Sequence, residues 1–141
     1  MAEAVELLKI LGDGTRLRLL RLLQQEPLSV VELQEVMDMG QSRISSHLGL
    51  LKQAGLVLDR REGKRSFYSA LPPEKPPARD IFNAVLDTVA TEPTYREDQS
   101  NLDRILSRRR AESEAYFNMV AERLGKNYCP GRSWEAIGHF L

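Results

Sequence analysis

The sequence has little of the chemistry that supports disulfide-rich, metal-loaded or membrane-bound proteins. It contains one cysteine, Cys129, and two histidines, which excludes an intrachain disulfide framework and a multi-cysteine metal cage. No apolar run approaches the roughly 20 residues that a membrane-spanning helix needs. The first six residues carry two glutamates and no basic residue, where a secretory signal would be basic and then apolar. We therefore expect a cytoplasmic protein that makes no use of a membrane.

The chain also lacks net charge, because its 20 lysines and arginines equal its 20 aspartates and glutamates. A nucleic-acid-binding surface on a neutral chain has to come from a local concentration of basic side chains. The segment from Arg43 to Arg65 has such a concentration, with six basic residues against Asp59 and Glu62. Apolar residues make up 42% of the chain, the level of an ordinary globular protein, so intrinsic disorder is a poor description.

The first 71 residues predict a series of short helices. Asp13 stands at an N-cap position before a leucine-rich stretch, which ends ahead of Pro27 because a residue that precedes proline is pushed out of the helical region. Ser29 and Glu32 have the spacing of a capping box, which opens another helix. An earlier short helix carries Leu7, Leu8 and Leu11.

A further helix and a hairpin complete this part of the chain. Gly40 and Gly55 bound the helix, since glycine commonly ends helices. Two β-type runs, 56–61 and 64–69, are separated by Glu62-Gly63, which predicts a two-stranded hairpin. Helices joined by a tight turn and followed by a basic hairpin have the order of a winged helix-turn-helix. We therefore expect a mainly α fold with a two-stranded β wing and C-terminal dimerisation helices.

Behind residues 1–71 the chain changes character. Four prolines lie within residues 72–77, so this segment is expected to be a stiff spacer. Residues 78–126 are then predicted to form a helical dimerisation and linker region. The first helix of this region has an apolar stripe, and too few residues of the same chain remain to bury it. We therefore expect the first helix of a second subunit to cover the stripe. The stripe consists of Ile81, Phe82, Val85, Leu86 and Val89.

A second, longer helix is expected after a break at Glu92-Pro93, from about Asp98 to Leu124. Arg108–Arg110 interrupts its apolar stripe, and we interpret this run as a solvated or inter-subunit face and not as a second DNA site. The neighbouring aromatic pair, Tyr116 and Phe117, is assigned to core or dimer packing and not to a ligand site.

The helix that starts at Gln41 has one apolar and one polar face. At 100° per residue, Ile44, Leu48 and Leu51 share the face that must point to the core. The opposite face is small, polar and lightly cationic, so it can enter a major groove about 12 Å wide and offer hydrogen bonds to base edges. Gly49 lies on this outer face, either because the backbone approaches DNA closely or because the glycine is simply tolerated.

The motif Q-S-R-I-S-S-H-L at 41–48, the A-G-L-V at 54–57 and the basic wing resemble the ArsR/SmtB family of bacterial winged-helix repressors. The segment L-G-D-G-T-R-L-R-L-L at 11–20 resembles that family's second helix, and the resemblance covers about residues 3–71. It implies a homodimer that binds operator DNA and releases it on sensing a ligand, often a metal ion or metalloid. We therefore expect a sequence-specific repressor of a near-palindromic operator.

The residues expected to contact double-stranded DNA lie on this helix and on the wing. The helix residues should meet bases or nearby phosphates, and the wing residues should meet the backbone or the minor groove. Two alternatives stay open: His47 could be a packing residue, and the wing's basic side chains could serve solubility alone. The full set is Gln41, Ser42, Arg43, Ser45, Ser46, His47, Arg60, Arg61, Lys64 and Arg65.

The two usual metal sites of the resembling family lack their ligands here. Serine and valine occupy the places within 28–33 where family sensors carry cysteines, and residues 81–90 hold Asp87 alone where others use Asp, His and Glu. Cys129 and His139 have no further plausible ligands near them in the sequence. We therefore predict no metal site and no cofactor. No nucleophile–base pair or phosphate-binding loop is recognisable either, so we do not expect an enzyme.

The last residues, 127–141, look like the start of a further, truncated domain. Asn127 to Trp134 resembles the junction through which longer ArsR-type proteins continue into a class I S-adenosylmethionine-dependent methyltransferase domain. The alternative function is therefore the regulatory part of such a fusion. In that case S-adenosylmethionine or S-adenosylhomocysteine would be the effector, bound by a domain beyond Leu141.

Overall fold

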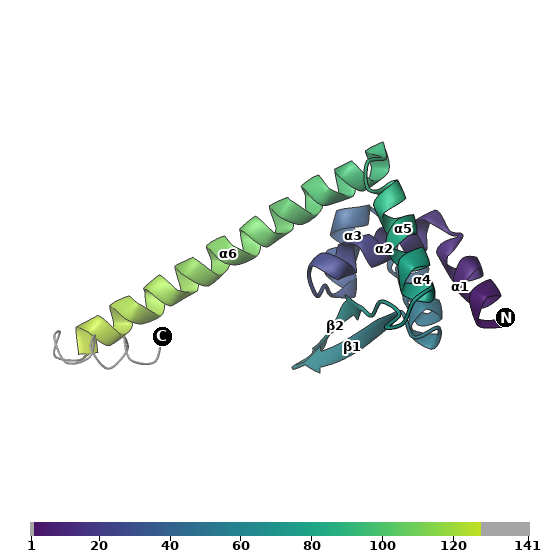
Figure 1. Cartoon of the computed structure of the whole chain (residues 1–141). Helices are drawn as coiled ribbons and strands as arrows, with labels where there is room; N and C mark the ends of the chain where they lie inside the picture. The colour runs from purple at the N-terminus through teal and green to yellow at the C-terminus, as the bar shows by residue number, and fades with distance from the viewer. Residues whose placement is uncertain (1, 128–141) are drawn as a thin grey trace. The chain divides into compact units, whose positions relative to one another are not determined.

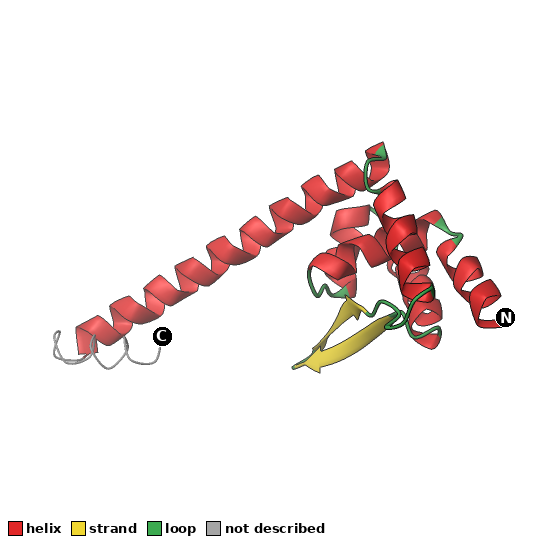
Figure 2. Ribbon diagram, viewed as in Figure 1, coloured by secondary structure: helices red, strands yellow, loops and turns green. Residues whose placement is uncertain are grey.

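The computed structural model describes residues 2–127, which form a mainly helical fold with one two-stranded hairpin (Figure 1). Figure 2 shows the hairpin as the sheet of the described part. This confirms the expected fold class. Residues up to Asp103 form one compact unit, and those from Arg104 onward belong to a second. The elements are α1 (Ala2–Leu11), α2 (Gly14–Gln25), α3 (Val30–Met37), α4 (Gln41–Gln53), β1 (Val57–Glu62), β2 (Arg65–Ala70), α5 (Ala78–Val89) and α6 (Pro93–Asn127).

The two helix starts predicted from capping residues are confirmed. The Asp13 carboxylate accepts hydrogen bonds from the backbone N–H groups of Thr15 at 2.8 Å and Arg16 at 3.2 Å. At α3, the Ser29 N–H donates to Glu32 Oε1 at 3.0 Å, and the Glu32 N–H donates to Ser29 Oγ at 3.3 Å. Each cap satisfies backbone donors that a helix leaves unpaired and contributes about 1 kcal/mol.

The turn between α3 and α4 depends on an aspartate as well as on the predicted glycine. Asp38 ends α3 in the left-handed region, with φ 52°, and its N–H donates to the Gln34 carbonyl at 2.9 Å. Aspartate tolerates this conformation better than most residues. Gly40 then occupies the N-cap of α4, and Gly55, with φ 78°, follows the end of α4 as predicted.

The hairpin turn lies one residue later than the sequence suggested. Glu62 pairs with Arg65, so the two loop residues are Gly63 and Lys64 and not Glu62-Gly63. Gly63 has φ 62°, and a glycine at the first loop position is typical of a type II′ turn. This turn matches the right-handed twist of the strands, which explains the shift.

Leucine side chains of α2, α3 and α4 form the core of the first unit. The three α4 residues predicted to face inward, Ile44, Leu48 and Leu51, are each at most 2% exposed. A backbone bridge connects the wing to the segment before α3, because the Tyr68 N–H donates to the Leu28 carbonyl at 2.8 Å and the Tyr68 carbonyl accepts from the Leu28 N–H at 3.1 Å. The core therefore fixes α4, and the backbone bridge fixes the base of the wing.

The expectation that the α5 stripe lacks cover within its own chain is wrong for two of its residues. Phe82 is 0% and Leu86 is 1% exposed, and α5 packs against α1 and α2 of the same chain. Ile81, Val85 and Val89 remain half-buried. One edge of the stripe is therefore buried in the chain's own core and the other edge is partly exposed. Helical periodicity predicts the stripe but not which partner buries each edge.

Helix α6 begins at Pro93 and not near Asp98. A proline within a helical pattern predicts a break, but proline is well suited to the first position of a helix because its missing N–H would be unpaired there in any case. Tyr95, Asp98 and Leu102 are buried in the first unit. In the second unit the helix continues to Asn127, with Tyr116 65% and Phe117 54% exposed.

Two further observations concern the ends and the surroundings of the chain. None of the helices in the described part is both long and apolar enough to cross a membrane. The predictions made for Cys129, for His139 and for the tail after Asn127 lie outside the described residues.

Candidate nucleic-acid interface

Helix α4 presents the polar side chains that the sequence assigns to DNA contact. Four of them are exposed: Gln41, Ser42, Arg43 and Ser46. Ser45 is half-buried, and its hydroxyl accepts a hydrogen bond from Gln41 Nε2 at 3.3 Å. The structure therefore brings small hydroxyl, amide and guanidinium groups onto one outer surface, as base reading in a major groove requires.

Gly49 lies on the same surface without a structural need for glycine. A Cβ placed on this residue would meet no heavy atom within 4 Å, and Gly49 is exposed within the helix. The chain's own packing would therefore accept a side chain. The choice between a close approach to DNA and a tolerated glycine depends on a binding experiment.

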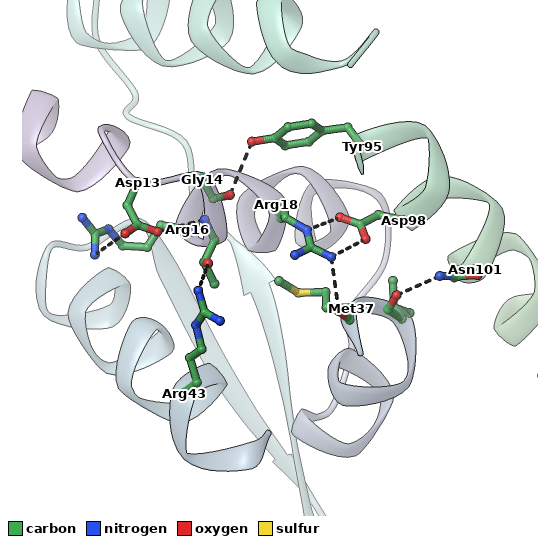
Figure 3. A network of polar contacts seen from close by, with 11 residues as sticks. Asp13, Gly14, Arg16, Arg18, Met37, Arg43, Tyr95, Asp98 and Asn101 are labelled. Carbon is green, nitrogen blue, oxygen red and sulfur yellow. Dashed lines mark hydrogen bonds and ion pairs between the residues drawn. The ribbon is translucent and has the colours of Figure 1, made fainter. Parts of the chain in front are cut away.

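Arg43 makes a contact that sequence reasoning missed. Its Nη2 donates to the hydroxyl of Thr15 at 3.3 Å (Figure 3), and Thr15 is buried at the start of α2. A guanidinium has five N–H donors in a planar fork. One bond to Thr15 restricts the arginine and leaves donors for a base, so the contact is compatible with a reading role.

His47 is half-buried and contacts Arg16, an arrangement that is compatible with packing and with DNA contact. Arg16 Nη1 lies 3.3 Å from His47 Nδ1, and Arg16 also donates to the carbonyls of Ile10 at 2.7 Å and Lys9 at 3.0 Å. Arginine can only donate, so Nδ1 accepts and the ring proton is on Nε2. The histidine therefore packs through one nitrogen and keeps a donor on the other.

The N-cap carboxylate beside Arg16 titrates below its usual range. Partial burial by itself would raise the pKa of Asp13, but the hydrogen bond from the Arg16 N–H and the charge of the Arg16 guanidinium outweigh it, so the pKa is lowered. Asp13 thus stays ionised and also stabilises the N-terminus of α2 through the helix dipole.

The wing carries the other predicted DNA-contacting residues, and all are exposed: Arg60, Arg61, Lys64 and Arg65. Two of them bond within the hairpin, Arg60 to the Glu62 carboxylate and Arg61 to the Gly63 carbonyl at 3.4 Å. Such exposed contacts contribute little to stability, so these side chains can exchange them for phosphates.

An ion pair that the sequence did not suggest connects the wing to α4. Lys52 Nζ lies 2.9 Å from Asp59 Oδ1, between the last turn of α4 and strand β1. The hydrogen bond from Lys52 lowers the pKa of Asp59. The pair links the two elements that would have to meet DNA together.

A buried ion pair holds the start of α6 against the helix-turn-helix (Figure 3). Arg18 donates to both carboxylate oxygens of Asp98, at 2.7 and 2.8 Å, and to the Met37 carbonyl at 3.3 Å. The side chains are only 16% and 5% exposed, and the bond to Asp98 raises the pKa of Arg18. Arginines that alternate with leucines, as in α2, would be expected on the outer face of the helix, but the Arg18 side chain is only 16% exposed.

Two further side chains of α6 extend this contact. Asn101 Nδ2 donates to the Val36 carbonyl at 3.0 Å, and the Tyr95 hydroxyl donates to the Gly14 carbonyl at 3.4 Å. Burial raises the pKa of Tyr95. Together with the Arg18–Asp98 pair, these contacts are called the α6 contact network below. No sequence signal indicated it, because its partners are 65 to 81 residues apart.

Comparison with known proteins gives the family. The model described as "Bacterial regulatory protein, arsR family" matches residues 13–58. The arsenical resistance operon repressor of Escherichia coli K12 is 44% identical over 69 residues, which are 48% of this chain and 59% of that protein. The transcriptional activator HlyU of Vibrio cholerae is 41% identical over 68 residues, 48% of this chain and 63% of its own. The chain thus spans about three fifths of these relatives.

Solved structures agree with the sequence matches. HlyU from Vibrio cholerae superposes with a TM-score of 0.55 at 31% identity, over 64% of this chain and 95% of that one. The homodimeric winged helix-turn-helix DNA-binding domain of Mb0332 from Mycobacterium bovis gives a TM-score of 0.51 at 32% identity, over 65% and 82%.

These comparisons also bear on the other expectations. They give no support to a fused methyltransferase or to an S-adenosylmethionine effector. The matched family consists of regulators and not of enzymes, in agreement with the sequence. The chain belongs to the ArsR family of DNA-binding transcriptional regulators.

Proposed function

We propose that the chain is a repressor that binds a near-palindromic operator as a homodimer, with α4 in the major groove and the wing on the backbone or in the minor groove. The observation that carries this proposal is the exposed polar face of α4 beside four exposed basic residues of the wing. In this arrangement the α4 residues, Arg43 foremost, read bases, and Lys64 and its neighbours neutralise phosphates.

A dimer interface built from α1 and α5 accounts for apolar side chains that the chain does not cover. Val5 is 51% and Leu8 is 56% exposed on α1, and the half-buried edge of α5 carries Ile81, Val85 and Val89. The two helices pack on each other within the chain, so a two-fold axis could bring both faces against a second copy. Two recognition helices then require half-sites about 10 base pairs apart, or a multiple of that.

The proposed repressor does not use the usual metal sites of its family. The start of α3 offers its N-cap Ser29 with Val30 and Val31, and residues 81–90 hold Asp87 without a histidine. Among the residues that the structure describes, no group of three or more His, Cys, Asp or Glu side chains could hold a metal ion. Neither helix therefore presents the set of ligands that the family's two usual metal sites require.

Selection of bound DNA sequences, followed by binding isotherms at stated salt concentrations, tests the proposal. Arg43→Ala should relax sequence preference by about 1–3 kcal/mol, because it removes a base contact. Lys64→Ala should weaken binding to all sequences alike. It should also lower by about one the magnitude of the slope of the log binding constant against the log salt concentration. Arg96→Ala, an exposed arginine of α6, is the matched control and should leave both unchanged.

The outcomes separate the parts of the proposal. A uniform loss in both variants would show that Arg43 contacts phosphate and does not read bases, and no selected sequence at all would refute DNA binding. A promoter reporter that carries the selected operator should fall when the protein is expressed. A rise would show activation instead.

A further inference from the structure

The C-terminal end of α3 is completed by side chains of α2 and α6. The last four carbonyls of an α-helix have no partner within it. The Asp38 N–H satisfies the Gln34 carbonyl, but the Val36 and Met37 carbonyls accept from the side chains of Asn101 and Arg18. A positive charge at this end also suits the helix dipole.

These carbonyls stand directly before the turn that leads into α4. Asp38, the next residue, holds the left-handed conformation that starts this turn. Its geometry sets how α4 departs from α3, so a contact at Val36 and Met37 bears on the orientation of the recognition helix. A positive φ is uncommon for a residue other than glycine, so contacts from outside the turn help to hold this conformation.

The support comes from residues of α6 that belong to the same compact unit as the helix-turn-helix. Asp98 is 4% exposed and holds the Arg18 guanidinium through two hydrogen bonds, which fixes the group that reaches Met37. Asn101 lies almost one helical turn further and reaches Val36 by itself. One bond thus connects α6 directly to the end of α3, and a second reaches that end from α2 through Arg18, which Asp98 of α6 holds in place.

We infer that Asp98 and Asn101 are positioning residues for DNA binding: through them the first turns of α6 hold the end of α3 and the turn into α4. This inference rests on the proposed reading of DNA by α4. It makes α6 part of the DNA-binding apparatus, although it lies beyond the winged segment, residues 1–71.

Asn101→Leu tests the inference with little risk to folding, because it keeps the size of the side chain and removes the amide donor. Loss of one net hydrogen bond should lower the fraction of molecules in the binding-competent orientation of α4 by a factor of up to about five. Operator affinity should fall by the same factor. Hydrogen exchange should quicken at the Asp38 amide, while the amides of α2 exchange as in the wild type. Asn101→Gln retains the amide and should restore part of the affinity.

Gln99→Leu is the matched control, since the Gln99 amide bonds to Asp103 of its own helix at 3.0 Å. It should change neither affinity nor exchange. Equal affinities for wild type and Asn101→Leu, or equal losses for Asn101→Leu and Gln99→Leu, would overturn the inference and leave the proposed function standing. A wild-type chain that binds no operator would overturn both.

Discussion

Replacing Gly49 by alanine should raise the stability of the protein and weaken its binding to DNA. Glycine in an exposed helix interior is less favourable than alanine, because it loses more backbone freedom on folding. Gly49 is such a residue, since it lies within α4, is exposed, and has no neighbour within 4 Å of an added Cβ.

The magnitude follows from the absence of any compensating clash. The helix preference for alanine over glycine is about 1 kcal/mol, and none of it is offset by steric strain in the free protein. For a chain of this size this corresponds to a rise in Tm of roughly 2–8 °C. In a DNA complex the methyl group would stand between the α4 backbone and a groove. Insertion of a methyl group into a closely packed interface costs about 1–3 kcal/mol, which is roughly a tenfold loss of affinity or more.

The assay combines thermal or urea unfolding with operator binding at one fixed salt concentration. Gly55→Ala is the matched control, because it also has no neighbour within 4 Å but has φ 78°. Alanine is strained in the left-handed region, so this variant should be less stable by about 1 kcal/mol or more. Opposite stability changes in the two glycine variants would confirm that backbone conformation decides the effect.

Two results would refute the reasoning. If Gly49→Ala destabilises the free protein, the added methyl group meets a neighbour and α4 is not free on this face. If affinity for the operator is unchanged, no DNA backbone or base approaches Gly49, and the glycine is merely tolerated.

Three further predictions concern the α6 contact network, pH and metal. Asp98→Asn should lower the free energy of unfolding by about 3 kcal/mol in urea titrations, because it leaves the buried Arg18 charge unpaired; a loss under 1 kcal/mol would contradict this. The pKa of Asp13 is lowered in the folded chain, so its contribution to stability is complete above the unfolded value near 4 and is lost as pH falls through the folded value. Asp13→Asn, which still caps α2, should therefore lose stability less steeply in acid. Zinc and arsenite should leave operator affinity unchanged, and release of DNA by either would reveal a metal site.

Local signals in the sequence determined most of the elements. The caps at Asp13 and Ser29, the break at Gly40 and the end of α4 at Gly55 all depend on residues within four positions of one another. The unpaired backbone groups at a helix end have few other possible partners, so the type and spacing of the capping residues predict where the helix begins and ends. The polar outer face of α4 was predictable for a related reason, because helical periodicity relates sequence directly to direction.

Only the tertiary structure decided which of these elements support one another. Arg18 and Asp98 are 80 positions apart, and their pairing leaves no periodicity in the sequence. The same holds for Arg43 with Thr15 and for the burial of Phe82 against the chain's own α1 and α2. An arginine on a helix or an apolar stripe has several equivalent partners in principle. Packing selects one of them, because a buried charge or a buried carbonyl must find its partner among the groups that the fold brings within hydrogen-bond distance.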